Sequence, residues 1–141
     1  MITNLVEYFI PEQEYYLDKI SYNRIEKTET IREYSLNCID NIETILQGDN
    51  VRVIVTRTLR FDPQEIFELS VSFGVILKFK SDKMKEYDWA TINLSDEFRE
   101  NGQFALGNLL SRITLLISEI TSSYGQPPLI LPPQISPRKK D

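Results

Sequence analysis

The chain has 141 residues, a net charge of −5, one cysteine and no histidine. The absence of histidine excludes Ser-His and Cys-His relays and removes the commonest zinc ligand, and a lone cysteine excludes an intrachain disulfide, which fits the reducing cytoplasm. The acidic balance opposes phosphate backbones, so nucleic acid is not expected as a partner.

The length fits one domain, which we expect over residues 1–135, with a short, polar and disordered tail at residues 136–141. The first candidate strand is Tyr15–Ile25, which is rich in tyrosine and isoleucine. Its alternation is imperfect because Lys19 and Arg24 interrupt it, a pattern that predicts an edge strand.

A second candidate strand is Tyr34–Leu46, which is rich in isoleucine. Cys38 lies within it, in an alternating apolar and polar stretch. We interpret Cys38 as a small core residue. The alternative is a reactive thiol, but there is no histidine to activate it.

The middle of the chain has the clearest pattern. Val51–Phe61 alternates with period two, which predicts a strand with one buried face. The pattern resumes over Phe67–Lys80, after turn residues at Asp62–Glu65. Two strands joined by so short a turn predict an antiparallel hairpin. With the two earlier strands, the sequence predicts a four-stranded antiparallel sheet in the order of a meander.

The remainder of the chain predicts an irregular connector and one long helix. Residues 81–103 have little periodicity, although Ser95–Phe98 predicts one helical turn and Trp89 is expected to pin the connector to the sheet. Residues 104–124 have leucine and isoleucine at helical spacing, which predicts a helix that covers the sheet. Polar residues interrupt its apolar run, so no insertion into a membrane is expected. Residues 126–133 are proline-rich and predict an extended segment that packs across the sheet or the helix end.

The side of this helix that faces away from the sheet carries small side chains. A helix on the outside of a monomer normally presents charges to water, whereas small side chains let a second helix approach closely. We therefore expect self-association here, the alternative being an ordinary exposed helix with serines. The expected oligomer interface comprises Phe104, Gly107, Ser111, Thr114, Leu115, Ser118 and Ser122.

Two segments resemble the SecB family of export chaperones. Val51–Phe79 resembles the third and fourth strands of the family. Gly107–Ile135 contains an amphipathic helix with an arginine, then a glycine, prolines and an apolar exit, in the order in which the family has them. The resemblance spans roughly residues 15–135, most of the chain, and includes no catalytic signature. It implies an α+β fold whose subunits pair into dimers and then tetramers.

The resemblance also implies a function. SecB-family members hold unfolded or nascent polypeptides in apolar grooves without ATP, and some pass them to the SecA motor while others serve toxin–antitoxin systems. The family has a second helix after the proline segment, and Ser136–Asp141 is too short for one. The tail contact with SecA and full closure of the groove are therefore not carried over.

Three functions are considered for this sequence. The first is a holdase for non-native chains, whose expected client-binding groove comprises Tyr15, Tyr16, Tyr22, Trp89 and Phe98. The alternative for these aromatic residues is that they pack in the core or in an oligomer interface. The second function is a dedicated partner-binding subunit, such as a chaperone of a toxin–antitoxin system or a phage or host adaptor. The third, an enzyme, is not expected, and neither is a cofactor or metal, because no phosphate loop, paired-cysteine site or nucleophile elbow is present.

Overall fold

The computed structural model describes residues 1–26, 33–125 and 127–136, so most of the tail expected at 136–141 lies outside the described residues. The elements, in chain order, are η1 (Leu5–Tyr8), β1 (Phe9–Ile25), β2 (Ser35–Gln47), β3 (Asn50–Asp62), β4 (Ile66–Phe79), η2 (Met84–Glu86), η3 (Trp89–Thr91), α1 (Leu94–Asn101) and α2 (Gln103–Ser122). The elements labelled η are single 3-10 turns.

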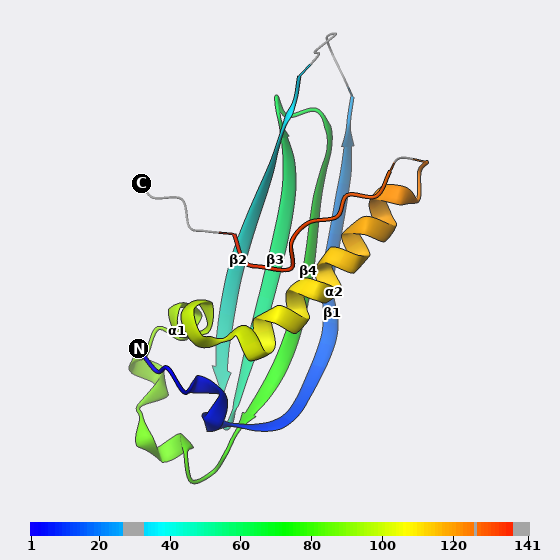
Figure 1. Ribbon diagram of the computed structural model, residues 1–141. Helices are drawn as coiled ribbons and strands as arrows, with labels where there is room; N and C mark the ends of the chain where they lie inside the picture. The colour runs from blue at the N-terminus through cyan, green and yellow to red at the C-terminus, as the bar shows by residue number, and fades with distance from the viewer. Residues whose placement is uncertain (27–32, 126, 137–141) are drawn as a thin grey trace.

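The strands form a four-stranded sheet in the order β1-β4-β3-β2, and every neighbouring pair is antiparallel (Figure 1). The predicted β3–β4 hairpin is confirmed, and β1 lies at an edge as expected. The predicted meander is wrong for β1, which pairs with β4 and not with β2. Sequence neighbours usually pair, but β4 is apolar enough to lie inside the sheet, and pairing with β1 buries it between two strands.

A β-bulge explains why the sequence of β1 alternates imperfectly. The register with β4 shifts between Leu17 and Lys19, and one extra residue at a bulge reverses the side to which the following side chains point. Tyr15 before the bulge and Tyr22 after it therefore lie opposite Val75 and Leu69 of β4, on the same face of the sheet. The strand also begins earlier than predicted, at Phe9, because Phe9 is buried in the core.

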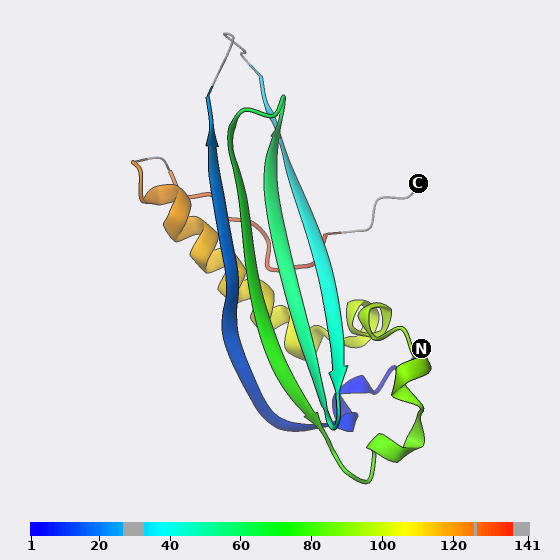
Figure 2. The same cartoon turned by 180° about the vertical axis from the view of Figure 1, so that it is seen from behind.

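Helix α2 lies diagonally across one face of the sheet, and no helix of the described chain covers the opposite face (Figures 1 and 2). The buried face of α2 meets the apolar side chains of β3 and β4 in the main core, which confirms the predicted amphipathic helix. Its buried apolar residues are Ala105, Leu106, Leu109, Leu110, Ile113 and Ile117. By length and composition α2 could cross a membrane, but packing on the sheet is the behaviour of a core helix.

The connector is more ordered than its sequence predicts. Where one helical turn was expected, α1 runs over Leu94–Asn101, and its first turn is capped by the side chain of Asn93, which accepts from the Asp96 amide at 3.2 Å. Trp89 pins the connector as predicted: it is buried, stacks near Phe79 with ring centroids 4.7 Å apart, and donates to the Met84 carbonyl at 2.9 Å.

Candidate functional site

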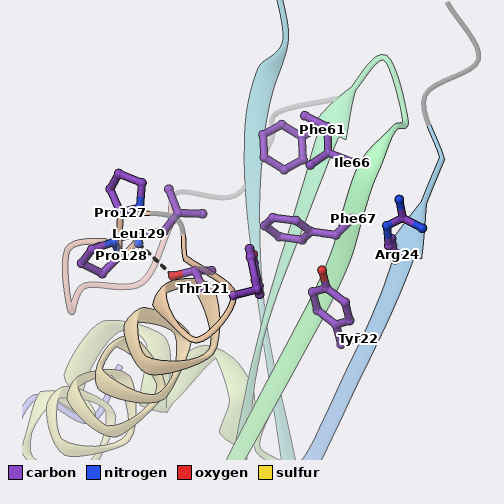
Figure 3. Close-up of a pocket in the computed structure, with 10 residues that line it drawn as sticks. Tyr22, Arg24, Phe61, Ile66, Phe67, Thr121, Pro127, Pro128 and Leu129 are labelled. Carbon is purple, nitrogen blue, oxygen red and sulfur yellow. Dashed lines mark hydrogen bonds between the residues drawn. The ribbon is translucent and has the colours of Figure 1, made fainter.

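An open pocket of about 840 Å³ lies beyond the end of α2, between the helix, the sheet and the segment that follows the helix (Figure 3). Aromatic and aliphatic side chains make up most of its wall. The lining residues are Tyr22, Arg24, Phe61, Ile66, Phe67, Thr121, Tyr124, Pro127, Pro128 and Leu129.

The pocket exists because α2 is shorter than the strands it covers. Its 20 residues span about 30 Å, whereas the 14 residues of β4 span about 46 Å. The helix ends at Ser122, and Gly125 follows with a φ of +85°, a left-handed conformation that suits glycine at a helix end. Pro127 and Pro128 prevent continuation. The far ends of β1, β3 and β4 therefore present apolar side chains that no helix covers.

Three aromatic rings form the floor of the pocket. Phe61 and Phe67 meet edge to face with centroids 5.1 Å apart, and Tyr22 stacks on Phe67 at 5.6 Å. Tyr124 approaches Tyr22 at 6.2 Å from the helix side. Burial, together with the neighbouring hydroxyl of Tyr22, raises the pKa of Tyr124 above its ordinary value. Such a surface suits apolar side chains of a ligand.

The polar groups of the pocket are few. Arg24 is exposed at the rim. Thr121 is buried, and its hydroxyl donates to the Ile117 carbonyl at 2.8 Å and accepts from the Leu129 amide at 2.9 Å. Ile66, whose side chain lines the pocket, has a φ of +74°, which is disfavoured for a β-branched residue, and such strain clusters at binding sites. Within the described residues, no group of three or more acidic, cysteine or histidine side chains could hold a metal.

Residues 127–136, here called the strap, run from the end of α2 back across the same face of the sheet to β2 (Figure 1). The extended segment predicted from the prolines is therefore confirmed. Arg57 donates to the carbonyls of Pro132 at 2.8 Å and Gln134 at 2.7 Å, and the Ser136 amide donates to Asp40 at 2.7 Å. The strap is thus bound to a charged pair in the sheet.

This pair is a buried, two-pronged ion pair between neighbouring strands. Arg57 Nε lies 2.8 Å from Asp40 Oδ1 and Arg57 Nη2 lies 2.9 Å from Oδ2, and the side chains are 2% and 0% exposed. Burial alone would raise the pKa of Asp40, but the hydrogen bonds from Arg57 and Ser136 outweigh it and hold that pKa below its ordinary value. This pair was not predicted from the sequence. The available signal was an arginine on the otherwise apolar face of β3, with an acid at the facing position of β2.

The expected groove residues do not come together. Tyr22 lines the pocket, and Tyr15 lies beside α2 with Arg112 stacked on its ring at 4.5 Å. Tyr16 points to the other face of the sheet, where a Cβ on Gly74 would lie within 2.3 Å of its ring.

Two of the expected groove residues belong to the core. Trp89 and Phe98 are 4% and 0% exposed. Phe98 packs near Phe9 and Phe104, with centroids 5.9 and 6.1 Å away, where the connector closes the sheet end farthest from the pocket. Large aromatic side chains bury much apolar surface, and in a small domain they commonly fill the core. Cys38, predicted as a small core residue, is half-buried and packs against the core without belonging to it, and burial raises the pKa of its thiol.

Only some residues of the expected oligomer interface are exposed on the surface of the protein. Ser111, Leu115 and Ser122 are exposed, and Gly107 and Ser118 are half-buried. Phe104 and Thr114 instead contact their own domain: Phe104 packs near Phe9 at 6.1 Å, and Thr114 accepts from Arg57 at 3.4 Å.

Replacing Ser118 with arginine is expected to lower the mass of the protein in solution, because a bulky charge on α2 blocks the approach of a second helix. Light scattering measures the mass, and circular dichroism checks that the fold is retained. Ser123→Arg is the control, since this exposed serine lies just beyond the helix. A wild-type protein that is already monomeric at micromolar concentration contradicts the predicted interface.

No family model matches the chain, and no curated protein does. Among solved structures it is similar to a SecB-like chaperone of Mycobacterium tuberculosis in complex with a ChAD peptide from the HigA1 antitoxin, with a TM-score of 0.66, 15% identity and 91% of each chain covered. A protein of unknown function from Streptococcus agalactiae matches with a TM-score of 0.45, 12% identity and coverage of 88% of this chain and 98% of that one.

The chain is therefore an α+β protein with a four-stranded antiparallel sheet and a covering helix. More particularly, it has the SecB-like fold, as its sequence resemblance predicts.

Proposed function

We propose that this protein is a chaperone that binds extended, apolar segments of non-native polypeptides in the pocket beyond α2, without ATP. The observation that carries the proposal is the pocket itself: about 840 Å³, open to solvent, with an aromatic floor and few polar groups. Enzyme active sites bring titratable and polar groups together around the reacting atoms, whereas capture of varied apolar segments needs a broad apolar surface.

The fold supports this proposal. The M. tuberculosis protein of the same fold was solved with a peptide bound, and a peptide is the class of ligand that the pocket suits. Strand β1 also lies at the edge of the sheet, where an extended client can run beside Tyr22 and Arg24. The proposal places the activity in the cytoplasm, on chains that have not yet folded.

A second candidate is a dedicated chaperone for one partner, and one observation favours it. The peptide in the M. tuberculosis complex comes from an antitoxin. In that case the pocket recognises one defined segment. Purification from the native cells separates the two functions: many partners in small amounts support a general holdase, and one stoichiometric partner supports the dedicated role.

The proposed activity predicts that the protein, at a one-to-one ratio and without nucleotide, suppresses the aggregation of denatured model proteins, because bound apolar segments cannot associate with each other. Light scattering after dilution from denaturant follows aggregation, with an unrelated acidic protein of similar size as the control. If none of several unrelated clients is protected, the general holdase is wrong and the dedicated partner remains.

A further inference from the structure

Most of the hydrogen bonds that hold the strap are made by its main chain. The Leu129 amide donates to Thr121, the carbonyls of Pro132 and Gln134 accept from Arg57, and the Ser136 amide donates to Asp40. Its side chains are partly exposed and partly packed on the domain. Ile130 is 75% exposed, and both Pro132 and Pro133 are exposed, while Leu129, Leu131 and Ile135 pack partly against the core.

The groups that hold the strap are rigid and fully engaged. A guanidinium has five N–H donors, and Arg57 directs its nitrogens at Asp40, Thr114, Pro132 and Gln134. Asp40, on β2, accepts two hydrogen bonds from Arg57 and so fixes the plane of its guanidinium group. The two carbonyls that Arg57 binds, those of Pro132 and Gln134, are brought to one guanidinium by a bend of the strap at Pro133 and Gln134.

We propose that Thr121, Arg57 and Asp40 form a binding site for the main chain of an extended polypeptide, which the strap occupies in the free protein and a client segment occupies when bound. The inference rests on the proposed function and adds a second, polar site to the apolar pocket. Every polypeptide has main-chain carbonyl and amide groups, so this site requires no particular side chain of its ligand, as binding of clients of varied sequence demands.

The two sites are continuous through the strap. Pro127, Pro128 and Leu129 form one wall of the pocket, and the hydrogen bond from Leu129 to Thr121 ties that wall to α2 (Figure 3). A client whose apolar side chains enter the pocket therefore meets the beginning of the strap. Release of the strap therefore does two things at once. It widens the pocket, and it frees Arg57 and Asp40 to form hydrogen bonds with the main chain of a client.

A tethered strap competes at an effective concentration in the millimolar range, so a client displaces it only by adding contacts that the strap does not make. The aromatic floor supplies such contacts. Tyr22 and Phe67, stacked on each other, belong to this floor and line the pocket. A segment that cannot fill the pocket makes no contacts beyond those of the strap and does not displace it. In the free protein the strap therefore keeps the Asp40–Arg57 pair covered.

A disulfide that locks the strap tests this inference. The hydroxyl of Ser136 lies 3.8 Å from the sulfur of Cys38, the one cysteine of the chain. Ser136→Cys gives a protein with two facing thiols that can be oxidised to fix the strap. The probe is a permanently unfolded, carboxymethylated model protein, which has no thiol of its own and is unaffected by reductant. With the lock closed, the affinity measured by fluorescence anisotropy is expected to fall at least about tenfold, the equivalent of one charge-assisted hydrogen bond, and reductant restores it.

Two further measurements make the outcomes decisive. The double variant Cys38→Ser, Ser136→Cys cannot lock and is expected to bind equally with and without reductant. Equal affinity of the locked and reduced protein overturns the inference and leaves the proposed function standing, whereas no binding by reduced or wild-type protein overturns the proposed function itself. In case the locked protein misfolds, hydrogen exchange of the wild type decides: saturating client is expected to speed exchange of the Ser136 amide, and unchanged protection overturns the inference.

Discussion

Replacing Asp40 with asparagine is expected to lower the free energy of unfolding by about 3–5 kcal/mol, the usual cost of removing one partner of a buried ion pair. The change keeps the shape of the side chain but leaves the charge of Arg57 without its counter-ion, at a side-chain exposure of 2%. It also weakens the bond to the Ser136 amide that holds the strap. Urea denaturation followed by circular dichroism measures the loss.

The matched control is Asp49→Asn. Asp49 also pairs with a base, Lys78 at 3.7 Å, but both side chains are 57% exposed, and exposed pairs contribute only about 0–1 kcal/mol. Acid provides a second comparison. Because the folded pKa of Asp40 is lowered, its contribution is fully present above the ordinary value of 3.8 and is lost as pH falls through the folded pKa. Equal losses for the two variants contradict a buried Asp40–Arg57 pair.

Replacing Tyr22 with aspartate is expected to weaken client binding about thirtyfold, since removal of an aromatic anchor at the centre of an interface typically costs about 2 kcal/mol or more. Tyr22 forms part of the aromatic floor, stacked on Phe67, so the new charge would lie among apolar surfaces of the client. The stability of the protein is expected to change little, because Tyr22 is 41% exposed on an edge strand. Fluorescence anisotropy with a carboxymethylated, unfolded client measures the affinity.

Ile39→Asp is the control for this effect. Ile39 is 42% exposed and lies on β2, the other edge strand. It faces Thr58 across the sheet and so points to the side opposite the pocket. The two variants therefore add the same charge at the same exposure on different faces. If Ile39→Asp weakens binding as much as Tyr22→Asp, the client does not lie in the pocket.

The sheet was predictable because burial of one face leaves a period-two pattern, which is clear in β3 and β4. The partner of β1 was not, because pairing between distant strands leaves no local signal and the bulge after Leu17 reverses the alternation. The end of α2 was also visible in Gly125, Pro127 and Pro128. Comparing its length with that of the strands could have located the uncovered pocket.

The candidate site was predicted only in part. Of the aromatic residues expected in a groove, Tyr22 lines the pocket and Trp89 and Phe98 fill the core, because an aromatic side chain serves a binding surface and a core equally well and composition does not distinguish them. The strap's own part in these hydrogen bonds left no sequence pattern, since the strap contributes main-chain atoms. Only Arg57, a charge on an apolar strand face, marked the place.

The most direct test of the account is to map where an unfolded client lies. A photoreactive benzophenone amino acid is placed at Tyr22 in one variant and at Ile39 in another, and each is illuminated with a carboxymethylated client in the absence of nucleotide. We expect efficient cross-linking from position 22, competed by unlabelled client, and little from position 39. Equal cross-linking from both positions, or none from position 22, would contradict the central claim that this protein holds polypeptides in the pocket beyond α2.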